Sequence, residues 1–212
     1  MNYLNLINKC LVELNYKQVN TFSELTKNDH KKIKNLLNLV NTEVCRMGKW
    51  NFLLKKHVFK LPKNMNEIEN PILGRITLLL VDGVKYEYCS DFKMFLAGHS
   101  PMNTYSQFND KLLFQKFNEE KTIEAVYYAN SNAIDIAGNY KNLLENEDDM
   151  SLIPEAFAEP ILVYGTCARH KASPKHVKFA YWLSMYKDAI ANLRTKDSVN
   201  IDESPQIKLF RN

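Results

Sequence analysis

The apolar residues of this chain change their spacing abruptly within the stretch CRMGKWNFLLKKHVFKLP, which runs from Cys45 to Pro62. Before Gly48 they recur every three or four residues, which is the spacing of a buried helix face. After Trp50, apolar and polar residues alternate, which is the spacing of a strand. The sequence therefore predicts mixed α and β structure, with a joint between helix and sheet formed by Gly48, Trp50 and Phe52.

Two amphipathic helices are predicted before this change. The first covers residues 2–14, where leucine and isoleucine recur at helical spacing. The second begins near Asn28 and Asp29, which are good N-cap residues, and ends before Gly48, which fits the position just past a helix end. Two such helices leave an apolar face open, so further helices have to cover it.

Strand signals fill the middle of the chain. Asp82-Gly83 lies between two apolar runs and predicts a hairpin, and Asn109-Asp110 predicts a second one. The run TIEAVYYA alternates and predicts one more strand. Between the hairpins, Ser90-Asp91 is expected to cap a short helix that reaches about Ala97. Residues 50–130 are therefore predicted to form a small antiparallel β domain.

The helical spacing returns near the end of the chain. Residues 131–152 are polar, include ENEDDM, and are predicted to be an acidic loop. Pro154 suits the first turn of a helix, and Ser173-Pro174 predicts the start of another. Pro160, early in the first of these helices, is expected to kink it.

These elements predict an α+β fold class. The helix pairs in residues 1–49 and 153–196 are expected to form one helical bundle, into which the antiparallel β domain of residues 50–130 is inserted. The acidic loop covers residues 131–152. Residues 197–212 are predicted to be a C-terminal interaction tail.

Composition limits the functions to be considered. The net charge of +4 is too small to indicate nucleic-acid binding by itself. The four cysteines form no CxxC pair and are expected to be buried and reduced. No motif of a nucleotide-binding, metalloprotease or hydrolase site occurs, so we expect no catalytic residues, no metal and no cofactor. The chain lacks a secretory signal and a long apolar run, so we expect no membrane association.

Basic residues in the first strand suggest one alternative function. Basic and aromatic residues interleave here, which is typical of nucleic-acid-binding surfaces, although an exposed sheet face gives the same alternation. Under this hypothesis the chain is a small nucleic-acid-binding protein that uses the basic sheet face. The residues expected to contact DNA are Lys55, Lys56, Lys60 and Lys63.

The end of the chain carries three large apolar residues after Pro205, namely Ile207, Leu209 and Phe210. Such a segment adds to a partner's sheet edge or docks in its groove. Packing of the segment on its own domain explains the same residues. The sequence leaves both readings open.

Short motifs follow one another in order over about residues 3–195. The two N-terminal helices and the exit from the second carry Leu6, Ile7, Asn8, Asn41, Val44, Gly48, Trp50 and Phe52. The middle segment KYEYCSDFKMFL carries Tyr86, Tyr88, Ser90, Asp91 and Phe92, and the late segment IPEAFAEPILVYGTCARHKA carries Pro154, Phe157, Leu162 and Ala168. In this ordered set the chain resembles the tail tubular protein A family of tailed bacteriophages. Cys89 stands where the family usually has proline, and the Asn- and Lys-rich sequence suits a crAss-like phage.

The resemblance implies a structural virion protein without catalytic activity. Family members are head-to-tail connector, or adaptor, proteins that form a ring, usually a dodecamer, between the portal and the tail. For this chain the resemblance implies five partners: further copies of itself, the portal protein, the tail nozzle protein, tail fibres, and genomic DNA passing through the lumen during ejection. It implies a place at the head–tail junction of the virion, after synthesis in the host bacterial cytoplasm. It also makes Ile207, Leu209 and Phe210 the expected interface with the portal or a neighbouring subunit.

Overall fold

The computed structural model of the chain describes residues 1–199. Contacts within the chain divide it into two compact units. The terminal unit combines Met1–Phe52 with the residues from Ser131 onward, and the inserted unit is Leu53–Asn130. Each unit has its own buried core.

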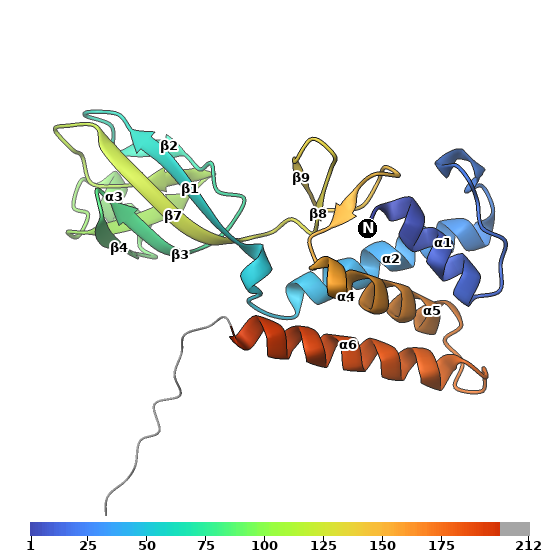
Figure 1. The fold of residues 1–212 in the computed structure, drawn as a ribbon. Coiled ribbons are helices and arrows are strands. Elements are labelled where there is room, and N and C mark those ends of the chain that lie inside the picture. The colour runs from blue at the N-terminus through green and yellow to red at the C-terminus, as the bar shows by residue number, and fades with distance from the viewer. Residues whose placement is uncertain (200–212) are drawn as a thin grey trace, which may run out of the picture. The chain divides into compact units, whose positions relative to one another are not determined.

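Helices form most of the terminal unit. Their bounds are α1 Tyr3–Glu13, α2 Asn28–Arg46, α4 Glu155–Glu159, α5 Gly165–His170 and α6 Phe179–Val199, with a 3-10 turn η1 at Phe22–Glu24, another, η2, beginning at Asn51, and a π-helical turn η3 at Pro160–Tyr164. Asn2 caps α1, because its side chain accepts a hydrogen bond from the backbone of Asn5 at 3.0 Å. In Figure 1, α6 runs alongside α4 and α5. The core between these helices includes Tyr3, Leu6, Ile7, Leu37, Leu162 and Trp182, all fully buried.

The predicted C-terminal helices differ from those observed. The first is broken into α4, η3 and α5, because Pro160 has no N–H to donate and the hydrogen-bond pattern widens to a π turn after it. The second does not start at Ser173. The backbone N–H of His176 donates to the Ser173 carbonyl in a separate turn, and α6 begins only at Phe179.

A three-stranded sheet completes the terminal unit. Its order is β10-β8-β9, with bounds β8 Ala133–Ile134, β9 Tyr140–Lys141 and β10 Met150–Ser151. It lies within residues 131–152, the segment predicted to be an acidic loop. Strands of two residues are too short to show an alternating pattern, so the sequence gives no sign of them.

The inserted unit is built on a seven-stranded sheet with the order β1-β7-β3-β4-β5-β6-β2. The bounds are β1 Leu54–Leu61, β2 Glu67–Glu69, β3 Gly74–Val81, β4 Val84–Tyr88, β5 Thr104–Phe108, β6 Lys111–Leu113 and β7 Lys121–Ala129, and a short helix, α3, spans Phe92–Leu96. Figure 1 shows that the strands of this sheet curl. The aromatic side chains buried in the core of this unit are Tyr86, Tyr105, Phe114 and Phe117.

Local signals in this unit are confirmed. Asp82 and Gly83 both have positive φ angles, 48° and 80°, and connect β3 to β4 in a tight hairpin. Asn109 and Asp110, at 46° and 58°, do the same between β5 and β6. The side chain of Asp91 caps α3 as expected.

The predicted fold class is wrong in its architecture. The protein is not a helical bundle with a small inserted antiparallel β domain, but an α+β fold dominated by a seven-stranded mixed sheet, with a second sheet of three strands. β4 and β5 pair in parallel, because α3 lies in the long connection between them and returns the chain in the same direction. Several helices are short, since α3, α4 and α5 span only five or six residues each. Residue spacing identifies strands one at a time and does not reveal which strands pair.

Candidate functional site

The described residues contain no group of three or more His, Cys, Asp or Glu side chains that could hold a metal ion. Within the same residues, no helix combines the length and hydrophobicity that crossing a bilayer requires.

The lysines predicted to contact DNA lie on or just after β1. Lys56 pairs with Glu124 at 2.5 Å, and Lys60 pairs with Glu120 at 2.6 Å, a hydrogen bond that raises the pKa of Lys60. Lys55 is half-buried, and Lys63 is exposed beyond the end of the strand. Lys56 and Lys60 thus already have carboxylate partners, which weakens the field that a phosphate backbone would meet.

The residues of the predicted joint are fixed within the terminal unit. The indole N–H of Trp50 donates to the Val44 carbonyl at 2.6 Å, and its ring stacks on Phe52 with centroids 5.7 Å apart. The next residue, Asn51, donates its backbone N–H to the carboxylate of Asp197 at 3.0 Å. Residues after α2 are therefore tied to the last turns of α6. Gly48 is exposed and contributes no contact of this kind.

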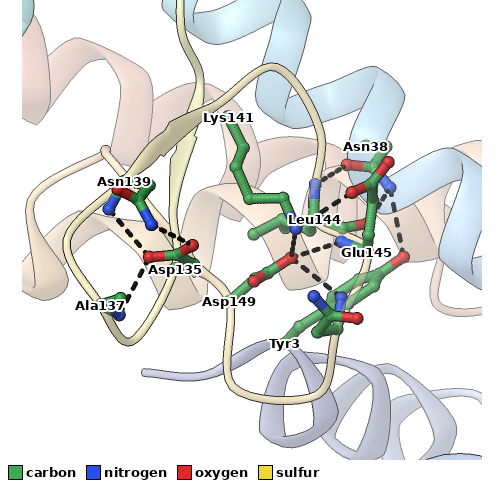
Figure 2. A network of polar contacts seen from close by, with 10 residues as sticks. Tyr3, Asn38, Asp135, Ala137, Asn139, Lys141, Leu144, Glu145 and Asp149 are labelled. Carbon is green, nitrogen blue, oxygen red and sulfur yellow. Dashed lines mark hydrogen bonds and ion pairs between the residues drawn. The ribbon is translucent and has the colours of Figure 1, made fainter.

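The acidic segment 131–152 holds a polar network, which Figure 2 shows. Asp149, which is buried, accepts hydrogen bonds from Lys141 Nζ at 2.9 Å and from the backbone N–H groups of Glu145 at 2.7 Å and Asn146 at 2.9 Å. Burial would raise the pKa of Asp149, but the ion pair and the two backbone donors outweigh it and lower that pKa.

The same segment is attached to the helices through Asn38 of α2. Its side-chain oxygen accepts from the Leu144 N–H at 2.8 Å, and its amide nitrogen donates to the Leu144 carbonyl at 2.9 Å (Figure 2). The amide nitrogen also lies 3.2 Å from the hydroxyl of the fully buried Tyr3. These polar groups satisfy one another, so the network holds the segment in place rather than presenting ligands to a cation.

The residues before, in and after α3 in the inserted unit include several exposed apolar side chains. Within residues 88–102, which we call the α3 segment, Tyr88 is 56% exposed, Leu96 59% and Met102 82%. The segment is nevertheless well anchored, because Phe95 is buried and the ring of Phe92 stacks on Phe108 of β5 at 4.3 Å. A fixed backbone that presents large apolar side chains to solvent is typical of a protein interaction surface.

The sequence reasoning placed α3 correctly but missed this surface. Leu96 and Met102 sit in a segment with no alternating pattern, so their exposure could not be predicted from spacing. The one available signal was the short capped helix, in which Phe95 is buried and Phe92 half-buried, while Met94 and Leu96 are exposed. The predicted interface residues Ile207, Leu209 and Phe210 lie outside the described residues.

Comparison with known protein families finds no family model that matches this chain, and comparison with curated proteins finds no match either.

Proposed function

We propose that the chain is a structural assembly protein that serves as an adaptor between the portal and the tail of a bacteriophage particle. The observation that carries this proposal is the α3 segment, where Tyr88, Leu96 and Met102 are exposed on an anchored backbone. Tyrosine and methionine are enriched in protein interfaces, so an anchored segment that exposes Tyr88, Leu96 and Met102 is a candidate contact surface.

The ordered motifs that resemble the tail tubular protein A family support the same proposal. Two of the motif residues have a clear structural role, since Asp91 caps α3 and Phe92 anchors it on β5. The motif that resembles the family thus positions the exposed surface. In this proposal the chain forms a ring by contacts between copies, and such head-to-tail contacts close by rotation.

The nucleic-acid-binding alternative has less support. Lys56 and Lys60 are engaged with carboxylates, and the net charge of the chain is only +4. A protein that holds free nucleic acid relies on several unpaired cations along one surface.

Quantitative mass spectrometry of purified virions from the source phage tests the proposal. We expect the chain in the particle, at several copies for each portal ring. Particles that lack the chain, although it is made during infection, would overturn the proposal.

A further inference from the structure

A pocket of about 370 Å³ lies entirely within the inserted unit, beside the turn of the β5–β6 hairpin. Its walls come from three parts of the chain: the residues between 70 and 74 that lead into β3, residues 107–111 around the hairpin turn, and Asn130 just after β7. Two backbone hydrogen bonds join these parts, because the Asn70 N–H donates to the Asp110 carbonyl at 2.8 Å and the Asn130 N–H to the Leu73 carbonyl at 3.0 Å. The pocket is therefore held in shape by the fold itself.

Four carboxamide side chains line the pocket, those of Asn70, Gln107, Asn109 and Asn130. The last three are exposed, and their side chains form no hydrogen bond with another described residue. The side-chain oxygen of Asn70 accepts from the Ile72 N–H at 3.0 Å, which leaves its amide nitrogen to donate. A carboxamide both donates and accepts hydrogen bonds, and so does a hydroxyl group. The lining therefore matches a ligand that carries several hydroxyl groups.

The charged groups at the pocket argue against an anion or a metal ion as the ligand. The ammonium group of Lys111 already pairs with Glu67 of β2 at 2.5 Å. The carboxylate of Asp110 is exposed, forms no ion pair with a described residue, and repels an anion. A single carboxylate does not hold a metal ion, and the described residues contain no group of three or more such ligands. The Asp110 carboxylate accepts hydrogen bonds only, which suits the hydroxyl groups of a neutral ligand.

An apolar part of the lining restricts the ligand further. Ile72 is buried, Phe108 is half-buried with its ring stacked on Phe92 of α3, and Leu73 is 71% exposed. A pyranose sugar has both kinds of surface, because its C–H groups form an apolar face and its hydroxyl groups project from the rim of the ring. A wholly apolar ligand would remove water from the carboxamides without replacing their hydrogen bonds. The volume lies near the lower end of the roughly 300–1,000 Å³ of small-molecule sites, which suits a single ring.

We propose that this pocket binds a neutral pyranose sugar. Gln107, Asn109 and Asn130 exchange hydrogen bonds with its hydroxyl groups, Asp110 accepts from one or two of them, and Leu73 contacts the apolar face of the ring. A single sugar ring has few atoms to contribute, so the expected dissociation constant is about 1 mM. The inference concerns the inserted unit alone and does not depend on the proposed adaptor function.

An NMR titration of the isotope-labelled, full-length chain tests the inference. The probes are the methyl glycosides of glucose, galactose, mannose and N-acetylglucosamine, each added up to about 50 mM, well above the expected dissociation constant. We expect at least one of them to give saturable shifts of backbone amides, confined to residues 70–74, 107–111 and 130 and their immediate neighbours.

A double variant, Gln107→Ala with Asn130→Ala, removes two of the carboxamides. Both side chains are exposed and unpaired within the described residues, so the fold should be unchanged. The loss of two hydrogen bonds should weaken binding of the same sugar about tenfold. The matched control is Asn66→Ala with Asn118→Ala, two exposed residues of the same unit outside the pocket, and it should bind as the wild type does.

Three results would overturn the inference. The first is that none of the four sugars gives saturable shifts. The second is that the shifts fall on amides elsewhere in the chain. The third is that the double variant in the pocket binds the sugar as tightly as the wild type and the control.

Discussion

The side chain of Asn38 and the backbone of Leu144 form a closed pair of hydrogen bonds, at 2.8 and 2.9 Å, between residues 106 positions apart in the sequence. Asparagine has both a donor and an acceptor at the end of a short side chain, so it reproduces the pairing of a backbone strand. Through this pair, α2 holds the segment that contains the three-stranded sheet.

Replacement of Asn38 tests this relationship. Asn38→Ala leaves the Leu144 N–H and carbonyl without partners, and we expect a loss of about 1–3 kcal/mol in the free energy of unfolding. Urea denaturation should show a lower midpoint with an unchanged slope. The control is Asn35→Ala, an exposed position on the same helix. Equal midpoints for the two variants would show that the pair adds nothing.

The close approach of α5 to α6 at Gly165 leads to a second prediction. A Cβ atom at Gly165 would lie 2.8 Å from the Tyr186 ring and 3.0 Å from Val40 Cγ1. Gly165→Ala should therefore destabilise the protein by about 1–3 kcal/mol from overpacking, less the gain of about 1 kcal/mol in helix propensity.

Gly48→Ala is the matched control for this prediction, because its nearest neighbour, a Trp50 ring atom, is 3.7 Å away. We expect thermal unfolding of this variant close to that of the wild type. If Gly165→Ala raised the midpoint of thermal unfolding instead, the packing described here between α5 and α6 would be incorrect.

His170 leads to a prediction about pH. Burial, and the nearby Lys32 and Lys171, lower the pKa of His170 below 6.5, while Asp29, 3.4 Å away, opposes this only in part. The folded state thus binds this proton less readily than the unfolded state, so stability should be constant above about pH 7 and fall as the pH drops below 6.5. His170→Gln should reduce this fall in denaturation midpoints measured between pH 7 and 5.5. The same pH dependence in both proteins would assign the effect to other groups.

The features that were predicted correctly are turns, a helix cap and helix faces, all of which depend on residues close together in the sequence. The Asp82-Gly83 and Asn109-Asp110 turns, the Asp91 cap and the stripes of α1 and α2 each depend on residues within a few positions of one another. The pairing of Leu54 with Tyr128 across β1 and β7, and of Asn38 with Leu144, depends on residues far apart. Such pairings are set by the packing of the whole core, and the architecture was mispredicted for that reason.

The basic strand β1 shows the same difference between local spacing and long-range pairing. Lys56 and Lys60 lie on one face of β1 together with Leu54 and Val58, which are exposed as well, so alternation alone does not explain their exposure. The partners of the two lysines, Glu124 and Glu120, come from β7 and the turn before it, and only the strand pairing brings them together.

These ion pairs lead to a prediction about the basic strand. The double variant Lys56→Gln, Lys60→Gln should leave the affinity for a random DNA duplex unchanged in fluorescence anisotropy at about 0.15 M salt, because neither lysine is free to replace a counterion. Lys63→Gln is the control, since Lys63 is exposed and forms no ion pair within the described residues. A marked, salt-dependent loss of affinity in the double variant would restore the nucleic-acid-binding hypothesis.

A double variant in the α3 segment tests whether this segment mediates the proposed assembly. Leu96→Glu combined with Met102→Glu places two charges on an exposed apolar surface, and it should leave the fold intact because neither side chain is part of the core. Ile136→Glu, at an equally exposed apolar position of the terminal unit, is the matched control.

Mass photometry of the full-length chain, alone and mixed with the portal protein of the same genome, is the most direct test of the adaptor proposal. The wild type and the Ile136→Glu control should join the portal in one large species with the mass of a ring of copies, and the α3 double variant should not. If the wild type fails to associate with the portal protein at any salt concentration, the adaptor proposal is contradicted. If the double variant associates as well as the wild type, the proposed role of the α3 segment is contradicted.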